Sequence, residues 1–435
     1  MKEWLRERVY SGALGPTRDG SRVVVAGWLQ ELRNLGGIAF LQLRDREGTV
    51  QLTLVKKENR ELFKRLTTLN RESVVAAACV LRANPEAPRG FELIPQEVEV
   101  ISEAAAPLPM GVVDRVGVEL DTRLTSRFID LRRPESSAVF KIRASMLAGI
   151  RETLEREGFI EVHTPKLVAT ATEGGTALFQ VQYFERKAFL NQSPQLYKQM
   201  LMATGLDRVY EIGPAFRAEE HDTVRHLNEF TSVDAELAFA DEEDAMGVLE
   251  RCLAGAIQRV LEERGRELET LRVSLDKPSV PLPRLPYSKC ARLAEEAGAA
   301  LEPDGDLGME ALRAVGEQQR GFYFITRWPA ALKPFYALPF DEKPDETRSF
   351  DLMFRERELA SGAQRVHDAA RLEQRLRESG LDPSGFRFYL EAFRYGMPPH
   401  SGWGLGAERA LMVLTDRDNI RECALFPRDR YRLTP

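Results

Sequence analysis

Apolar and polar residues alternate in short runs over the first hundred positions, a pattern typical of half-buried β-strands. We predict strands at 22–30, 38–45, 49–55, 73–83 and 91–102, with one helix at 56–69 between the third and the fourth. Pro107 and Pro109 then interrupt the alternation, which indicates a linker.

Beyond this linker the apolar residues change to helical spacing. Val139, Ile142, Met146, Ile150 and Leu154 predict a long amphipathic helix at 136–158. Predicted strands at 159–165, 188–192, 208–216, 228–237, 348–354, 357–365 and around 402–406 alternate with predicted helices at 194–205, 241–265, 364–379 and 385–394. Residues 268–331 give a weaker signal that is Pro-rich and then helical.

These two patterns predict two domains of different class. Five short strands with a helix between the third and the fourth match an OB-fold barrel, which commonly binds single-stranded nucleic acid. Interleaved strands and helices predict an α+β domain. We therefore expect an all-β OB-fold domain at 1–104, a linker or hinge at 105–135 and an α+β domain at 136–435.

Composition narrows the class of protein. The 435 residues are 43% hydrophobic, which is ample for buried cores. No apolar run approaches the roughly 20 residues of a membrane helix and no secretory signal begins the chain, so we expect no membrane contact and a cytoplasmic location. Four scattered cysteines suggest neither disulfides nor zinc. The net charge of −6 argues against indiscriminate nucleic-acid binding, although residues 1–60 are rich in arginine and lysine.

Candidate binding residues gather in a few stretches. In "GPAFRAEEHDTVRHLNEF", Arg217 ends a predicted strand and could grip a phosphate or carboxylate with two N–H groups, and Phe230 could stack on a base. In an arbitrary protein, Arg217 and Glu219 would more often form a surface ion pair. Asp351 and Glu358, carboxylates within apolar strand-like runs, suit Mg²⁺, which prefers oxygen ligands.

A Gly-rich stretch near the C-terminus, "GWGLGAERALM", raises a further possibility. Gly402, Gly404 and Gly406 alternate with larger apolar residues, as in a strand whose backbone is approached closely, and an apolar helix follows directly. Arg409 at this turn could hold a phosphate.

These stretches occur together in a known order. A long helix followed by "GFIEVHTP", then "FRAE" and "HLNEF", then "GWGLGAERALM" resemble the three motifs of class II aminoacyl-tRNA synthetases. The segments "QSPQLYKQ", "FLQLRDREG" and "SGAQRVHD" extend a resemblance to the aspartyl-tRNA synthetases over essentially the whole chain. The short interval between the second and third motifs resembles the compact archaeal type. The resemblance implies a catalytic domain built on an antiparallel sheet at 136–435 and an anticodon-binding barrel at 1–104.

The implied reaction has two steps: ATP-dependent activation of L-aspartate to aspartyl-adenylate, and transfer of the aspartyl group to the 3′ end of tRNA-Asp. Two anions must meet in the first step, so positioning and charge neutralisation dominate. By resemblance, the catalytic residues are Arg217, Glu219 and Arg409, and ATP is held by Arg217, Glu219, His226, Phe230, Glu358, Gly406 and Arg409. Mg²⁺ is assigned to Asp351 and Glu358.

By the same resemblance, L-aspartate is bound by Glu173, Gln195, Lys198, Arg217, Asp234, Ser361 and Arg365. Selection of aspartate over asparagine requires cations that face the side-chain carboxylate, and Lys198 and Arg365 are assigned to this role. Glu173 lies in "TEGGTALF", which we interpret as a mobile lid hinged at Gly174 and Gly175.

In the barrel, the resemblance places Phe40 and Gln42 under anticodon bases and Arg33 and Arg44 on the nearby tRNA backbone. Phe40 could instead be core packing. Pro85 stands where compact members that charge both tRNA-Asp and tRNA-Asn carry a proline, which implies relaxed anticodon reading, although the same proline could simply shape a turn.

Several alternatives stay open. They are a strictly tRNA-Asp-specific enzyme, an asparaginyl-tRNA synthetase, a non-catalytic RNA-binding paralogue and an amide-forming synthetase on a bare class II core. Lys198 and Arg365 count against the asparaginyl enzyme, the intact candidate site counts against the paralogue, and the barrel is unexplained by a bare core.

The first motif implies a two-fold homodimer. The sequence does not decide whether an amidotransferase acts on Asp-tRNA-Asn.

Overall fold

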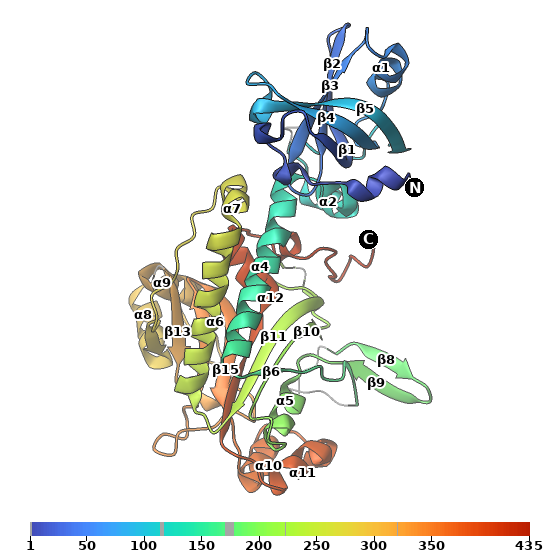
Figure 1. Cartoon of the computed structure of the whole chain (residues 1–435). Helices are drawn as coiled ribbons and strands as arrows, with labels where there is room; N and C mark the ends of the chain where they lie inside the picture. The colour runs from blue at the N-terminus through green and yellow to red at the C-terminus, as the bar shows by residue number, and fades with distance from the viewer. Residues whose placement is uncertain (1, 114–116, 170–177, 222, 320) are drawn as a thin grey trace. The chain divides into compact units, whose positions relative to one another are not determined.

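The computed structural model describes residues 2–113, 117–169, 178–221, 223–319 and 321–435 (Figure 1). The chain divides into two compact units, one up to Asp130 and the other from Leu131 onward. The first unit ends with two short helices, α2 (Leu120–Thr125) and α3 (Arg127–Asp130). The sequence-based borders at 104 and 135 stay predictions.

A closed five-stranded barrel forms the first unit, with strand order β1-β2-β3-β5-β4. Its strands are β1 (Arg22–Asn34), β2 (Ile38–Arg44), β3 (Thr49–Val55), β4 (Val74–Ala83) and β5 (Phe91–Ser102). Alternate residues point inward, so Ala39, Leu41 and Leu43 of β2 are buried while Phe40 and Gln42 between them are only partly buried. The helix α1 (Arg60–Thr67) adds Phe63 and Leu66 to the core. The predicted OB-fold barrel is confirmed.

The second unit is built on an eight-stranded sheet with the order β12-β13-β14-β15-β16-β11-β10-β6. The strands are β6 (Ile160–Glu161), β10 (Arg208–Phe216), β11 (Glu229–Ala238), β12 (Arg284–Pro286), β13 (Phe322–Thr326), β14 (Ser349–Phe354), β15 (Arg357–Gln364) and β16 (His400–Gly406). Strands β10, β11, β16, β15, β14 and β13 are antiparallel, as expected, but β6 and β12 join the two edges in parallel. The sheet is therefore mixed rather than purely antiparallel.

Helices cover one face of this sheet. The long helices α4 (Pro134–Arg156) and α6 (Glu242–Glu263) lie side by side on it with α12 (Ala407–Thr415), as Figure 1 shows. Val233, Trp403 and Leu405 face them in the main core. Gly149 lets α4 approach α6 closely, because an added Cβ would lie 2.8 Å from the Cα of Ala256.

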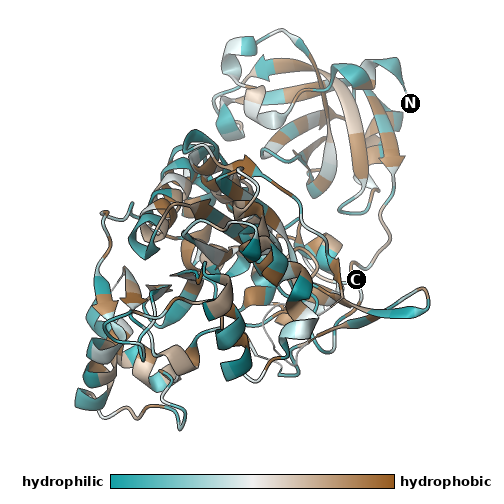
Figure 2. Cartoon of the chain, turned by 90° about the horizontal axis from the view of Figure 1, so that it is seen from below, coloured by the Kyte–Doolittle hydropathy of each residue, from teal (hydrophilic) through white to brown (hydrophobic). Residues whose placement is uncertain are grey.

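Smaller elements surround this core. The helices are α5 (Gln195–Met202), α7 (Gly265–Leu271), α8 (Tyr287–Glu296), α9 (Met309–Gln319), α10 (Ala369–Glu378) and α11 (Arg387–Arg394), and a small sheet joins β7 (Leu167–Val168), β8 (Gln180–Tyr183) and β9 (Arg186–Leu190). In Figure 2, apolar and polar residues alternate along the barrel strands. No helix in the described part of the chain is long and apolar enough to cross a membrane.

Candidate active site

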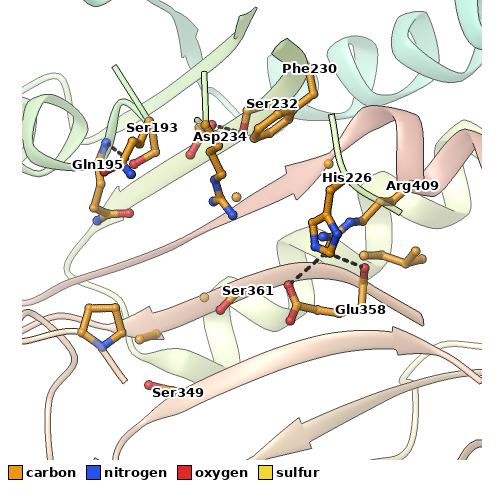
Figure 3. Close-up of a pocket in the computed structure, with 18 of the residues that line it drawn as sticks. Ser193, Gln195, His226, Phe230, Ser232, Asp234, Ser349, Glu358, Ser361 and Arg409 are labelled. Atoms are coloured by element: carbon orange, nitrogen blue, oxygen red, sulfur yellow. Dashed lines mark hydrogen bonds and ion pairs between the residues drawn. The ribbon is translucent and has the colours of Figure 1, made fainter. Parts of the chain in front are cut away.

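A pocket of about 250 Å³ opens on the sheet face that the long helices leave free (Figure 3). The face is set by strand alternation, since Ser232, Asp234 and Glu236 of β11 point away from the core that takes Val233 and Ala235. Strand register then places polar groups in one row across the sheet. Asp351 pairs with Ser361, Ser361 with Gly404, and Gly404 with Asp234.

Most of the predicted site residues line this pocket. They are Gln195, Arg217, Glu219, His226, Phe230, Asp234, Glu358, Ser361, Arg365, Gly406 and Arg409. Lys198 and Asp351 are not among the lining residues, and Glu173, with Gly174 and Gly175, lies outside the described residues. The Nε2 atom of Gln195 is buried and has no hydrogen-bond partner in the described structure, so this donor is available to a ligand.

Arg217 follows the end of β10 and is held in place by the returning strand. Its backbone N–H donates to the Asn228 carbonyl at 2.9 Å, and its guanidinium carbon lies 5.4 Å from the centroid of the Phe230 ring. Among the described residues no carboxylate lies within ion-pair distance of Arg217. This cation is therefore stacked on an aromatic ring while its N–H groups can take an anion.

The pocket favours the neutral form of His226. Burial, together with the nearby positive charge of Arg409, lowers the pKa of His226 below its usual value. Its Nδ1 lies 2.7 Å from the Thr223 hydroxyl. A neutral imidazole oriented by this contact can donate or accept a hydrogen bond without adding charge to the site.

Asp351 and Glu358 fit a divalent cation. Desolvation by the pocket walls and the negative charge of Asp351 raise the pKa of Glu358, whose side chain still keeps 47% of its surface exposed. Lys333 binds one oxygen of Asp351 at 2.6 Å, while the other, Oδ1, is buried without a partner in the described structure. Two adjoining carboxylates with an unpaired buried oxygen match the oxygen-rich donor set that Mg²⁺ prefers. No group of three or more His, Cys, Asp and Glu side chains in the described ranges is arranged to hold a metal ion, so these two carboxylates would need further oxygens from a ligand.

A network of buried charges lies at the other end of the pocket. The Lys198 ammonium contacts Asp234 at 3.0 Å, the Trp403 carbonyl at 2.9 Å and Glu236 at 3.5 Å. These contacts hold Lys198 beside Asp234, which lines the pocket, and its role toward the aspartate carboxylate stays a prediction.

Arg365 does line the pocket, and Glu236 fixes its orientation. Its Nε and Nη2 atoms donate to the two Glu236 oxygens at 2.9 and 3.2 Å. Burial alone would raise the pKa of Glu236, but Arg365 and Lys198 outweigh it and hold that pKa below its usual value. The guanidinium is thus a fixed cation whose Nη1 remains available to a ligand.

Several of these neighbours were missed from the sequence. Glu236 stands two residues after Asp234 on a predicted strand, so period-two alternation could have placed both on one face. Lys333 lies in an irregular stretch that gives no such signal. Glu408, next to Arg409, lines the pocket and also anchors the start of α12, since it accepts from Arg143 of α4 at 3.1 Å and from the Thr231 backbone N–H at 3.0 Å.

The barrel residues predicted for tRNA divide into two groups. Arg33 is exposed and pairs across the sheet with Phe40, and it lies on the same outer surface as Gln42. Phe40 is not among the described residues that pack against the barrel core. Arg44 is instead buried and donates to both oxygens of Glu72 at 2.9 and 2.7 Å. In this structure its guanidinium is committed to Glu72, and its contact with the tRNA backbone stays a prediction.

Pro85 is exposed at the tip of the turn between β4 and β5. The Ala87 N–H donates to the Asn84 carbonyl at 3.0 Å, and the Asn84 side chain accepts from the Glu86 N–H at 3.0 Å. Proline at the second position is favoured in such a turn. Pro85 therefore shapes the turn and is also accessible to a partner.

Comparison with protein families decides the class. Residues 119–430 match the family described as tRNA synthetases class II (D, K and N), and residues 23–101 match the OB-fold nucleic acid binding domain. The chain belongs to the class II tRNA synthetases. Its eight-stranded sheet and its pocket lie within the part of the chain that this family covers.

Relatives of this synthetase match it over their full length. It is 53% identical to the Aspartate--tRNA(Asp/Asn) ligase of Methanocaldococcus jannaschii, over 100% of this chain and 99% of that protein. It is 49% identical to the Aspartate--tRNA(Asp) ligase of Thermoplasma acidophilum, over 98% and 100%. Among solved structures, asparaginyl-tRNA synthetase from Pyrococcus horikoshii with asparaginyl-adenylate gives a TM-score of 0.94 at 34% identity, over 99% and 100%.

Proposed function

We propose that this synthetase activates L-aspartate with ATP and transfers it to both tRNA-Asp and tRNA-Asn. The observation that carries the proposal is the distribution of charge along β15. Glu358 lies near the start of β15 and Arg365 directly follows its end, a separation along the strand of roughly 23 Å. The pocket carries Arg409 beside Glu358 and Arg365 at the other end, which suits an extended ligand such as an aminoacyl-adenylate.

The nucleotide belongs at the end that carries Phe230, Glu358 and Arg409. Phe230 offers an aromatic face for adenine, while Arg217 and Arg409 offer guanidinium groups for phosphates. Glu219 and His226 line the same end and supply further hydrogen-bonding groups. Mg²⁺ bound at Asp351 and Glu358 would neutralise phosphate charge when ATP is present.

The amino acid belongs at the end that carries Arg365. Its fixed guanidinium favours the aspartate carboxylate over the asparagine amide, because a neutral amide cannot replace an anion beside a desolvated cation. Asp234, Gln195 and Ser361 are placed to meet the ammonium and backbone of the substrate. Arg217 lies where carboxylate and α-phosphate must meet, so it holds two anions together and needs no protein nucleophile.

The proposal of two tRNA substrates rests on the relatives and on Pro85. The ligase of Methanocaldococcus jannaschii is named for both tRNAs, whereas that of Thermoplasma acidophilum is named for tRNA-Asp. The deciding experiment is aminoacylation of tRNA-Asp and tRNA-Asn transcripts with labelled aspartate. We expect both to be charged; charging of tRNA-Asp alone would show a strictly specific enzyme. An amidotransferase acting on Asp-tRNA-Asn would then be a downstream partner.

Asparagine activation is a second candidate, which the structural likeness to asparaginyl-tRNA synthetase favours. Pyrophosphate exchange driven by asparagine instead of aspartate would establish it.

The further proposals are a cytoplasmic location and a two-fold homodimer. Ile160 on the edge strand β6 is 47% exposed, as expected of a strand that meets a second subunit. A monomeric mass by light scattering at micromolar concentration would exclude the dimer.

A further inference from the structure

The loop between β10 and β11 carries several pocket residues, Glu219 and His226 among them, yet it has no regular secondary structure of its own over residues 217–221 and 223–228. A polar loop of this kind samples many conformations unless other groups hold it. Binding of a nucleotide would then have to supply the ordering free energy. The contacts that restrain this loop therefore bear on how well the site is organised before ATP arrives.

The restraints come from the C-terminal segment, residues 420–430, which begins in the short helix η7 (Ile420–Cys423). Hydrogen bonds join it to the described part of the loop: Ile420 N to Val224 O at 2.9 Å, Arg421 Nη1 to Thr223 O at 3.0 Å, Asn228 N to Arg428 O at 2.8 Å, and Arg430 Nη1 to Glu220 O at 2.7 Å. These hydrogen bonds therefore hold the loop, at several points, to a segment about 200 residues further along the chain.

Arg421 joins the segment to the loop through a side chain that is itself held by a carboxylate. Its side chain is nearly buried, and its Nε donates to Asp429 Oδ2 at 2.7 Å while its Nη1 reaches the Thr223 carbonyl. Asp429 is fixed in turn, because its other oxygen accepts the backbone N–H groups of Tyr431 at 2.9 Å and Arg432 at 2.8 Å. Charge-assisted bonds of this kind are strong and directional.

The chain of contacts continues into the pocket. The hydroxyl of Thr223, the residue whose carbonyl Arg421 holds, lies 2.7 Å from His226 Nδ1. We propose that Arg421, oriented by Asp429, is a positioning residue for ATP: it fixes Thr223, and Thr223 fixes His226 at the nucleotide end of the pocket. Arg421 itself does not line the pocket, so it acts only through the loop. The inference rests on the proposed function for the identity of the nucleotide.

The test measures the KM for ATP and for aspartate in pyrophosphate exchange for R421M, R421K and T223V. Loss of a charge-assisted bond predicts a KM for ATP about tenfold higher in R421M. The KM for aspartate should stay within about twofold, because the amino acid binds at the far end of β15. R421K, which keeps one charged donor, should recover part of the loss, and T223V should raise only the KM for ATP.

A matched control is R208M. Arg208 also donates a side-chain N–H to a carbonyl, that of Glu157 at 3.2 Å, but it stands at the opposite end of β10 from the loop. R208M should leave both KM values unchanged. An R421M enzyme in which both KM values change equally, or neither changes, overturns the proposal, and so does a T223V enzyme with normal KM for ATP.

Amide hydrogen exchange separates this inference from the proposed function. In R421M the amides of residues 223–228 should exchange faster than in the wild-type chain, while those of β15 and β16 keep their rates. This readout does not depend on activity. If the wild-type chain shows no aspartate-dependent exchange of pyrophosphate, the proposed function fails, whereas unchanged amide exchange in the loop of R421M contradicts the positioning role alone.

Discussion

Gly402 makes room for the buried charges of the site. An added Cβ would lie 2.1 Å from Glu236 Oε2 and 2.3 Å from the Ala235 carbonyl, whereas at Gly406 the nearest atoms are 3.7 Å away on the flexible Arg409 side chain. We expect G402A to displace Glu236 from Arg365 and to cost about 3 kcal/mol or more of folding free energy. G406A should unfold at nearly the wild-type temperature. Thermal unfolding followed by circular dichroism compares the two, and equal midpoints for G402A and wild type would contradict the packing described.

His400, at the start of β16, makes stability depend on pH. Its ring is fully buried with Nδ1 2.9 Å from the Pro398 carbonyl, and burial lowers its pKa to about 4. An unfolded histidine has a pKa near 6.5, so as the pH falls the unfolded chain takes up the proton first. The stability that the fold gains from a neutral His400 is complete above pH 6.5 and is lost as the pH falls toward 4. This loss lowers the free energy of unfolding by about 3 kcal/mol.

The variant H400Q cannot titrate in this range, and it should lack this part of the pH dependence. Denaturant unfolding of both proteins at pH 7 and pH 4.5 measures it. We expect the wild-type protein to lose more stability than H400Q between the two values. Identical losses would show that His400 is not held neutral by the fold.

For single residues, the sequence indicates which residue types the site uses better than it indicates which way each side chain points. Arg217, Phe230 and Arg409 could be predicted for the pocket because motif order brings them together. The ion pairs of Lys198 on α5 could not, since its partners Asp234 and Glu236 lie on β11, more than thirty residues further along the chain. The pairing of Arg44 was missed for the same reason, because its partner Glu72 lies in a different part of the barrel unit.

Among the elements, β2 separates a packing role from a binding role. Leu41 and Leu43 fill the barrel, while Phe40 between Ala39 and Leu41 stays outside the core. We expect F40A to raise the KM for tRNA about tenfold, since base stacking on an aromatic is worth a few kcal/mol at most, and to leave aspartate-dependent pyrophosphate exchange unchanged. F388A, which removes a phenylalanine 40% exposed on α11, is the control. If F40A lowers the unfolding temperature without changing the KM for tRNA, Phe40 is a packing residue.

Elements with a clear local pattern were predicted closely. The five barrel strands and α4 occur where alternation and helical spacing placed them, with ends differing by a few residues. Strands β12 and β13 were missed in the stretch 268–331. Most of β13 is buried on both faces, with Tyr323, Phe324 and Ile325 inaccessible, so it shows a continuous apolar run instead of alternation. The parallel pairing of β6 and β12 is set by distant neighbours and leaves no local signal.

For the whole molecule, a net charge of −6 coexists with a pocket that gathers Arg217, Arg225, Lys333, Arg365 and Arg409. Bulk charge therefore says little about the ligand, and the local field of the pocket decides it. The account depends on this cluster, which allows an anionic amino acid to approach the phosphates of ATP.

The most direct measurement is exchange of labelled pyrophosphate into ATP by the purified chain with Mg²⁺, with aspartate or asparagine as the added amino acid. We predict exchange that depends on aspartate and is far weaker with asparagine. Absence of exchange with aspartate, under conditions in which the chain is folded, would contradict the account.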